Sequence, residues 1–195
     1  YVTGMSVSNS IMSGGTAFGA DAPGDYNLFW NTVIATGSGN LAVLQTGAGG
    51  QAHSTVANPQ FFDAANLDFH LRSETGRYDP TLGGFVTTDT NTSPAVDFGD
   101  PMASYASELP PNGNRLNAGS QGNTAEASKG RTNAWLQVLN YVDGGTLSVP
   151  TDPVYWNAGQ MAGSTTVRVE YSPDGGENWS VVATNILASD GYYIW

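Results

Sequence analysis

The sequence contains no cysteine and little positive charge. Among its 195 residues there are 6 Lys or Arg against 17 Asp or Glu, which gives a formal net charge of −11. Without cysteine the chain has no disulfide framework, no thiolate metal site and no thiol nucleophile. Proteins that bind nucleic acid neutralise phosphates with Lys and Arg, so the charge argues against a nucleic-acid partner.

Positive charge is completely absent from the first third of the chain. No Lys or Arg precedes Arg72. No apolar run approaches the roughly 18 residues of a membrane-spanning helix, so we expect no membrane insertion. The chain begins at Tyr1 without Met or a leader and ends at Trp195 in what reads as a strand, so we expect a piece of a longer protein.

Regular helical periodicity is nearly absent as well. Short apolar runs alternate with Gly, Asn, Ser and Pro, a pattern typical of strands joined by tight turns. The hydrophobic content of 39% and the aromatic content of 11% argue against a disordered chain. The sequence therefore predicts an all-β protein.

Two early segments resemble each other. Residues 7–12 align with residues 25–30 at an offset of 18, which places Asn9 over Asn27. A period near 20 residues, with a short strand and an Asn in each copy, is typical of a solenoid of stacked β-coils, in which Asn side chains can bond from coil to coil. The alternative is that two unrelated strands share an Asn.

Three sequence blocks follow in a fixed order. They read N-P-x-F-x-D-x-x-N-x-D-F-H-L at residues 58–71, S-P-A-x-D-x-G-D-P at 93–101, and N-G-x-R-x-N-x-G at 112–119. This order resembles the C-terminal closing region of bacterial right-handed parallel β-helix repeat proteins, which are secreted or anchored at the cell surface. Asn58 stands where that family usually has Asp, and Phe98 stands where a small residue is common. The resemblance implies that residues 1–130 form the last coils and their capping loops.

The texture changes to alternating apolar strands from Asn133 onward, at residues 135–139, 154–156, 167–171 and 179–182. With V-x-V-E-Y-S-x-D-G-G-x-x-W at 167–179 and G-x-Y-x-W at 191–195, this part resembles immunoglobulin-like or fibronectin-like modules of bacterial surface proteins. A sandwich needs about 100 residues, so residues 131–195 would form only part of one. The expected fold is thus the C-terminal coils and cap of a right-handed parallel β-helix plus a partial antiparallel β-sandwich.

Two local segments carry their own predictions. The Gly-rich and Thr-rich stretch from Thr75 to Asn91 reads as a long surface loop. The segment from Ser172 to Trp179 approximates the Asp-box hairpin of sialidase propellers, but one copy cannot build a propeller. Its Asp-Gly-Gly sequence predicts a tight turn with a structural role.

Catalytic residues are not evident in the chain. Polysaccharide lyases need a base such as Lys or Arg, which the residues before Arg72 do not offer. Hydrolases need two carboxyl groups at a set separation, and Asp21 with Asp25 would be such a pair, although the Ala-Pro-Gly between them favours turn capping. His53 and His70 have no evident partner, and His70 reads as structural. We expect none of these residues to be catalytic.

Calcium is the metal that the sequence fits best, because Ca²⁺ takes carboxylate, amide and carbonyl oxygens from loops. Two acid-rich blocks supply candidate ligands: Asp63, Asn66 and Asp68 in the first, and Asp97, Asp100 and Glu108 in the second. Capping of turns by the same side chains explains the pattern equally well.

Contact with carbohydrate is the best-supported binding role. Tyr and Trp rings on a β surface can stack on sugars, and the candidates are Tyr26, Trp30, Tyr78 and Tyr105. The alternative is that such rings pack within or along the solenoid.

We therefore expect a noncatalytic structural or adhesive part of an extracellular bacterial surface protein, secreted or held at the cell surface. Its partners would be polysaccharide or further copies of surface protein. One alternative is the scaffold and cap of a carbohydrate-active enzyme, a polysaccharide lyase or glycoside hydrolase whose catalytic coils lie upstream. A second alternative is a subunit of an extracellular filament.

Overall fold

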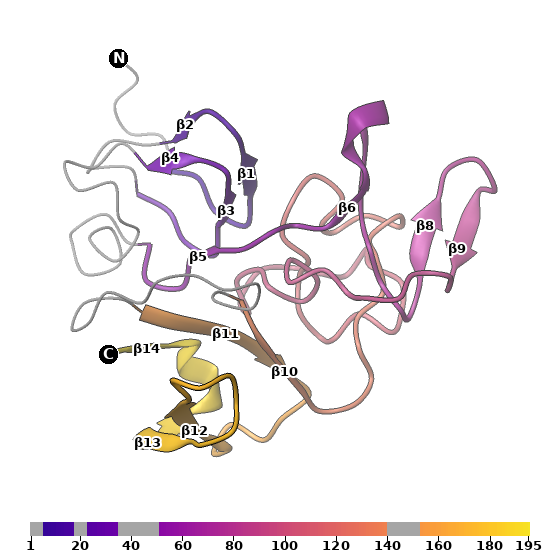
Figure 1. The fold of residues 1–195 in the computed structure, drawn as a ribbon. Helices are drawn as coiled ribbons and strands as arrows, with labels where there is room; N and C mark the ends of the chain where they lie inside the picture. Colours follow the sequence, from indigo (N-terminus) through magenta and orange to yellow (C-terminus); the bar gives the residue numbers. More distant parts are fainter. Residues whose placement is uncertain (1–5, 18–22, 35–50, 140–152) are drawn as a thin grey trace. The chain divides into compact units, whose positions relative to one another are not determined.

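The computed structural model describes residues 6–17, 23–34, 51–139 and 153–195 (Figure 1). Fourteen short strands dominate these residues, and their helical content is two 3₁₀ turns, η1 (Ala64–Asn66) and η2 (Ala188–Asp190). The prediction of an all-β protein is confirmed. Neither helical turn in the described residues has the length to cross a lipid bilayer. The chain divides into two compact units, residues 1–133 and 134–195, which are treated separately below.

Parallel pairing organises the N-terminal part of the first unit. One parallel sheet has the order β1 (Ile11–Ser13), β3 (Leu28–Trp30), β5 (Thr55–Val56). A second parallel pair joins β2 (Thr16–Ala17) to β4 (Val33–Ile34). Leu28 and Phe29 on the central strand are fully buried, so β3 anchors the core of this stack.

The register of the stack differs from the predicted repeat. Ile11 pairs with Leu28 and Leu28 pairs with Thr55, so the offsets are 17 (28 − 11) and 27 (55 − 28). The predicted offset of 18, with Asn9 over Asn27, is therefore wrong by one residue. With the observed offset of 17, Asn27 lies beside Ser10 instead of Asn9. A shift of one residue also changes which side chains share a face of the sheet. The Asn9 side chain accepts from the Asp100 N–H at 2.6 Å, in the region of the predicted cap.

The parallel strands do not extend into a complete coil. Each parallel sheet contains two or three strands of two or three residues, and the residues that the structure describes form no closed solenoid. What is established is the all-β class with parallel pairing in its first part.

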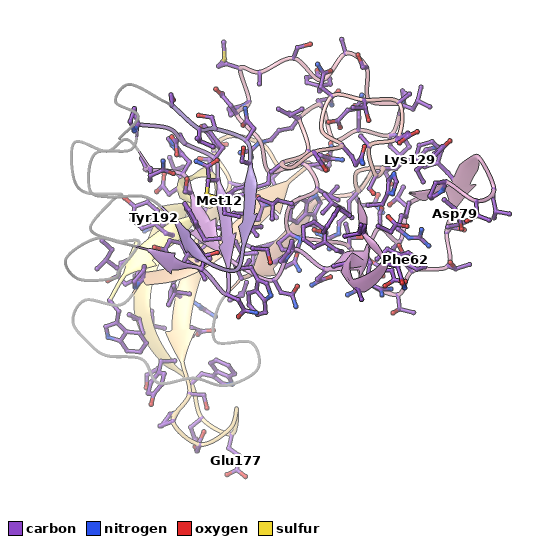
Figure 2. The ribbon with its side chains drawn as sticks, turned by 90° about the horizontal axis from the view of Figure 1, so that it is seen from above. Met12, Phe62, Asp79, Lys129, Glu177 and Tyr192 are labelled. Carbon is purple, nitrogen blue, oxygen red and sulfur yellow. The ribbon has the colours of Figure 1, made fainter. Side chains whose placement is uncertain are left out.

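Two antiparallel hairpins follow the stack. The first pairs β6 (Phe61–Asp63) with β7 (Asp68–Leu71), and the second pairs β8 (Arg77–Asp79) with β9 (Gly84–Val86). The second hairpin lies inside the stretch predicted as a surface loop, so that prediction is wrong. The reason is Arg77, whose buried side chain bonds Asp89 at 3.2 Å and lies 3.4 Å above the centre of the Phe62 ring. Figure 2 shows Lys129 near this hairpin, where its Nζ lies 4.5 Å from the centre of the Phe85 ring.

The cap region, residues 92–131, is built from turns without any strand or helix. Its small core comprises the buried side chains of Ala95, Val96, Phe98, Leu116, Ala118 and Ala127. Backbone bonds close it internally, from Ala118 N–H to the Ala95 carbonyl at 2.9 Å and from Gly99 N–H to the Leu116 carbonyl at 2.7 Å. Long-range bonds of this kind replace the ladders of a regular sheet.

The second unit contains two antiparallel sheets. One has the order β10 (Trp135–Val138), β11 (Pro153–Gly159), β14 (Tyr192–Ile194), and the other pairs β12 (Thr166–Tyr171) with β13 (Ser180–Leu187). Strands are thus present at all four predicted positions. Tyr155 and Trp156 are buried on β11, and the Trp156 indole N–H donates to the Ala188 carbonyl at 2.8 Å.

Candidate functional site

Polar side chains link neighbouring segments of the parallel stack, and we call this set of bonds the coil ladder. The Ser8 hydroxyl accepts from the Asp25 N–H at 3.0 Å, and the Asp25 carboxylate accepts from the His53 N–H at 2.7 Å. Two positions later, the Asn27 amide oxygen accepts from the Ser10 N–H at 3.0 Å. Each bond joins a side chain on one segment to the backbone of the next, so these polar groups hold the stack together.

Asn27 is the centre of the coil ladder and is fully buried. Its amide nitrogen donates to the Val7 carbonyl at 2.7 Å and to the Gln51 amide oxygen at 3.0 Å. Its backbone N–H donates to the Ser54 hydroxyl at 2.9 Å. A buried side chain with this many partners fixes the register of three chain segments.

Tyr26, the first candidate for sugar contact, has one ring face covered. The His53 ring stacks on it with centroids 4.7 Å apart and planes 3° apart, and the Arg115 guanidinium lies 5.4 Å from its ring centre. Burial raises the pKa of the Tyr26 hydroxyl, against an opposing effect of the Arg115 charge. The ring therefore packs along the stack, as the alternative interpretation had it for such residues.

The other aromatic candidates are dispersed. Trp30, Tyr78 and Tyr105 are each half-buried. The Tyr78 ring contacts His70 at 5.7 Å and Phe85 at 5.6 Å between centroids. In the described part of the chain, no ring contact joins any two of the four candidates, so they do not form one platform.

Both histidines have carboxylate partners, contrary to the prediction. The His53 ring nitrogen Nδ1 lies 2.6 Å from Asp25. Asp25 is thereby tied to His53, while Asp21, its suggested hydrolase partner, lies outside the described residues. His70 is buried, with Nδ1 2.6 Å from Asp68 and Nε2 3.5 Å from Glu126. Local spacing cannot show the His53–Asp25 pair, because these residues are 28 positions apart, whereas Asp68 lies only two residues before His70.

In the first block of calcium candidates, the carboxylates of Asp63 and Asp68 accept hydrogen bonds from residues two or three positions away. Asp63 accepts from the Asn66 side-chain amide at 2.7 Å and caps the 3₁₀ turn η1. Asp68 accepts from the backbone and ring of His70. Burial raises the pKa of Asp68, but the hydrogen bonds from His70 and the charge of Arg77 outweigh burial and leave that pKa below its ordinary value.

The second block divides between the surface and the interior. Asp100 closes a turn by accepting from the Met102 N–H at 2.8 Å. Glu108 is buried, and one of its oxygens accepts from the N–H groups of Asn117 and Asn123, both at 2.9 Å. Across residues 6–17, 23–34, 51–139 and 153–195, no three His, Asp or Glu side chains are arranged to hold a metal. Within these ranges, neither block of candidates brings three carboxylates together.

Asp97 is the most unusual of these residues, and we call Asp97 and Glu108 the cap carboxylate pair. Asp97 is 4% exposed, and neither of its carboxylate oxygens has a partner in hydrogen-bond geometry. Burial raises its pKa to about 7, and the charge of Glu108 acts in the same direction. The charges of Arg115 and Arg131 and a backbone hydrogen bond from Arg131 oppose this shift of the pKa. Burial also raises the pKa of Glu108, against its two backbone hydrogen bonds.

The Asp-box segment forms the tight turn that its sequence predicts. Asp174 accepts from the Asn178 side chain at 2.6 Å, from the Asn178 N–H at 2.9 Å and from the Ser172 hydroxyl at 2.7 Å. These bonds lower the pKa of Asp174 to about 2. Gly175 has a φ of +75°, the conformation for which glycine is preferred in such a turn. The tight turn that the motif predicts is confirmed.

Trp179 is a candidate contact residue that the sequence analysis missed. It follows the turn whose tip carries Glu177 (Figure 2), and 60% of its surface is exposed. Its indole N–H donates to the Gly176 carbonyl at 3.0 Å, which holds the exposed ring in place. The sequence pattern predicts a strand that includes Trp179, whereas β13 begins one residue later at Ser180.

Comparison with known proteins adds no assignment, since no family model, no curated protein and no solved structure matches the chain.

Proposed function

We propose that the chain is a noncatalytic structural and adhesive part of an extracellular bacterial surface protein. The coil ladder carries this proposal. Its carboxylate, amide and hydroxyl groups bond the backbone of the neighbouring segment, as Asp25 and Asn27 do. Side chains committed in this way stabilise a stacked scaffold.

The finer fold belongs to the same proposal. The first unit would be the end of a right-handed parallel β-helix, since its strands pair in parallel and its three sequence blocks resemble the closing region of that family. The second unit would be part of an immunoglobulin-like sandwich, since it contains two small antiparallel sheets. The same resemblance supports secretion or display at the bacterial surface.

Contact with carbohydrate is assigned to Trp179. An exposed aromatic ring stacks on the apolar face of a sugar, and a ring that is already held in place loses little conformational freedom on binding. Trp179 has both properties, through its 60% exposure and its bond to Gly176. The ionised Asp174 and the nearby Glu177 favour a neutral glycan over a uronate, because like charges repel.

The test is a binding screen of the whole chain against neutral and acidic polysaccharides, with and without Ca²⁺, read by tryptophan fluorescence. We expect binding to a neutral glycan and about a tenfold loss of affinity for Trp179→Ala, the change that one stacked ring supports. Tyr105→Ala is the control and should bind like the parent chain. Equal loss in both variants would contradict the assignment to Trp179.

The same preparation separates the alternatives. Shortening of any polysaccharide by the purified chain would replace the proposal with a carbohydrate-active enzyme. Large particles in light scattering would favour the filament subunit. Absence of glycan binding in every condition would remove carbohydrate as the partner and leave other copies of surface protein.

A further inference from the structure

The cap carboxylate pair is buried with fewer hydrogen bonds than two ionised carboxylates need: Glu108 accepts through one oxygen only, and a backbone hydrogen bond from Arg131 opposes the effect of burial on the pKa of Asp97. Asp97 is 4% exposed and Glu108 is 3% exposed. Three of their four oxygens, both of Asp97 and Oε2 of Glu108, have no partner in hydrogen-bond geometry. Burial away from water disfavours the charged form of a carboxyl group, and a second carboxylate nearby disfavours it further.

The pair is coupled through one residue. The Asp97 N–H donates to the Asn117 amide oxygen at 2.7 Å, and the Asn117 N–H donates to Glu108 at 2.9 Å. The Asn117 amide nitrogen bonds the Ser128 carbonyl at 2.6 Å. Asp97, Glu108 and Asn117 thus connect three stretches of the cap that are distant in sequence.

Backbone encloses the Asp97 carboxylate on two sides. A Cβ atom added to either Gly113 or Gly130 would collide with its oxygens. The charged groups that act on Asp97 are Glu108, Arg115 and Arg131. Arg115 directs its guanidinium to the Phe98 and Gly99 carbonyls.

We propose that Asp97 is a buried proton-binding site, and that its proton locks the cap region in the folded state. With the proton bound, the carboxyl group is neutral, and burial away from water then costs little free energy. When the proton leaves, a second negative charge appears beside Glu108 and the cap weakens. This inference does not depend on the proposed function.

A proton suits this position better than a metal ion. Calcium takes six to eight oxygen ligands. No group of three His, Asp or Glu within the described ranges is arranged to hold a metal, and the two glycines occupy space beside the carboxylate. A proton needs no such set of ligands, because it converts one carboxylate oxygen into a donor.

The direction of the pH effect follows from linkage. The pKa of Asp97 is raised to about 7 in the folded chain, and it returns to roughly 4 on unfolding. The folded state therefore binds more protons between these values. The contribution of Asp97 is fully present below about pH 4 and is lost as the pH rises through about 7, with at most about a tenfold fall in the folding equilibrium constant per pH unit.

The experiment is urea unfolding of the whole chain between about pH 5 and about pH 8, where this linkage acts. We expect the folding equilibrium constant of the parent chain to fall as the pH rises, and that of Asp97→Asn to fall less steeply, because the amide stays neutral and only the raised pKa of Glu108 still contributes. Asp100→Asn is the matched control, since Asp100 is only half-buried and its carboxylate accepts a backbone N–H within a turn, and it should keep the parent's slope. A level parent profile, or an unchanged slope in Asp97→Asn, overturns the proposal.

A second measurement covers the case in which Asp97→Asn does not fold. Carboxyl ¹³C NMR of the parent chain follows Asp97 directly, and we expect a midpoint near 7. A midpoint in the ordinary range of about 4 overturns the proposal. Calcium added to the parent chain at alkaline pH gives the remaining outcome, because stabilisation comparable to that of acid would identify a cation site in place of a proton site.

Discussion

At the scale of single residues, the first unit depends on buried polar side chains as much as on apolar ones. Asn27 is the clearest case, because both ends of its side-chain amide and its backbone N–H are bonded. We expect Asn27→Ala to lower the free energy of unfolding by about 2 to 4 kcal/mol, since it leaves buried partners unsatisfied. Urea unfolding at neutral pH measures this.

Asn91 provides the control for that substitution. It is exposed, and its side chain donates to Gln60 at 2.6 Å. Asn91→Ala should change the free energy of unfolding by less than about 0.5 kcal/mol. A similar loss of unfolding free energy for both variants would mean that the hydrogen bonds of Asn27 do not stabilise the stack more than an exposed Asn does.

Residue chemistry could be predicted from the sequence more readily than residue environment. Asn27 was identified as a member of the stack, but its neighbour was misplaced by the one-residue shift in register. The burial of Asp97 could not be predicted, because Gly113 and Gly130, which enclose it, follow it by 16 (113 − 97) and 33 (130 − 97) positions. Local spacing does not report contacts of that range.

At the scale of elements, the turn between β12 and β13 is fixed by one carboxylate. The pKa of Asp174 is lowered to about 2, so its bonds favour the turn above the ordinary value near 4 and are lost as the pH falls through about 2. We expect Asp174→Ala to speed hydrogen exchange at the Asn178 amide, which bonds Asp174 in the parent chain. Exchange measured by NMR at neutral pH tests this.

Glu177 offers a matched comparison on the same turn, at its exposed tip. Glu177→Ala should leave the exchange rate of the Asn178 amide unchanged. If Asp174→Ala also left it unchanged, the carboxylate would not be what holds the turn.

Elements that depend on neighbouring residues were predictable, and those that depend on distant partners were not. The strands of the second unit and the Asp174 turn follow from alternation and turn chemistry within a few residues. The β8–β9 hairpin is not predicted because its stretch is rich in Gly and Thr, and nothing nearby in sequence shows that Arg77 is buried against Asp89 and Phe62. A charged residue is reliably predicted to be exposed only when the interior offers it no group of opposite charge.

At the scale of the whole molecule, the division at residue 133 defines two compact units. The coil ladder, the hairpins and the cap have their bonds within the first of them. We expect a chain of residues 1–133 to fold alone with a thermal midpoint within about 5 °C of the corresponding transition in the full chain. Circular dichroism melting checks this, and failure of the shorter chain to fold would show that it needs the second unit.

The all-β class could be predicted from composition and turn residues, since these are properties of the whole chain. The arrangement of the parallel strands could not, because their pairing joins residues 17 and 27 positions apart and depends on register rather than composition. Pairing between distant residues also decides the cap region. Its sequence blocks indicate turns, but they do not show which carboxylate oxygens are left without hydrogen-bond partners.

The unequal offsets of the parallel stack have a consequence for how such a chain can change over generations. The paired residues of the three aligned strands lie 17 positions apart in one interval and 27 in the next. Insertions and deletions can accumulate between the aligned positions while those positions stay in place. Equivalent positions in such a protein are therefore identified by which residues pair between strands, and not by a fixed spacing along the sequence.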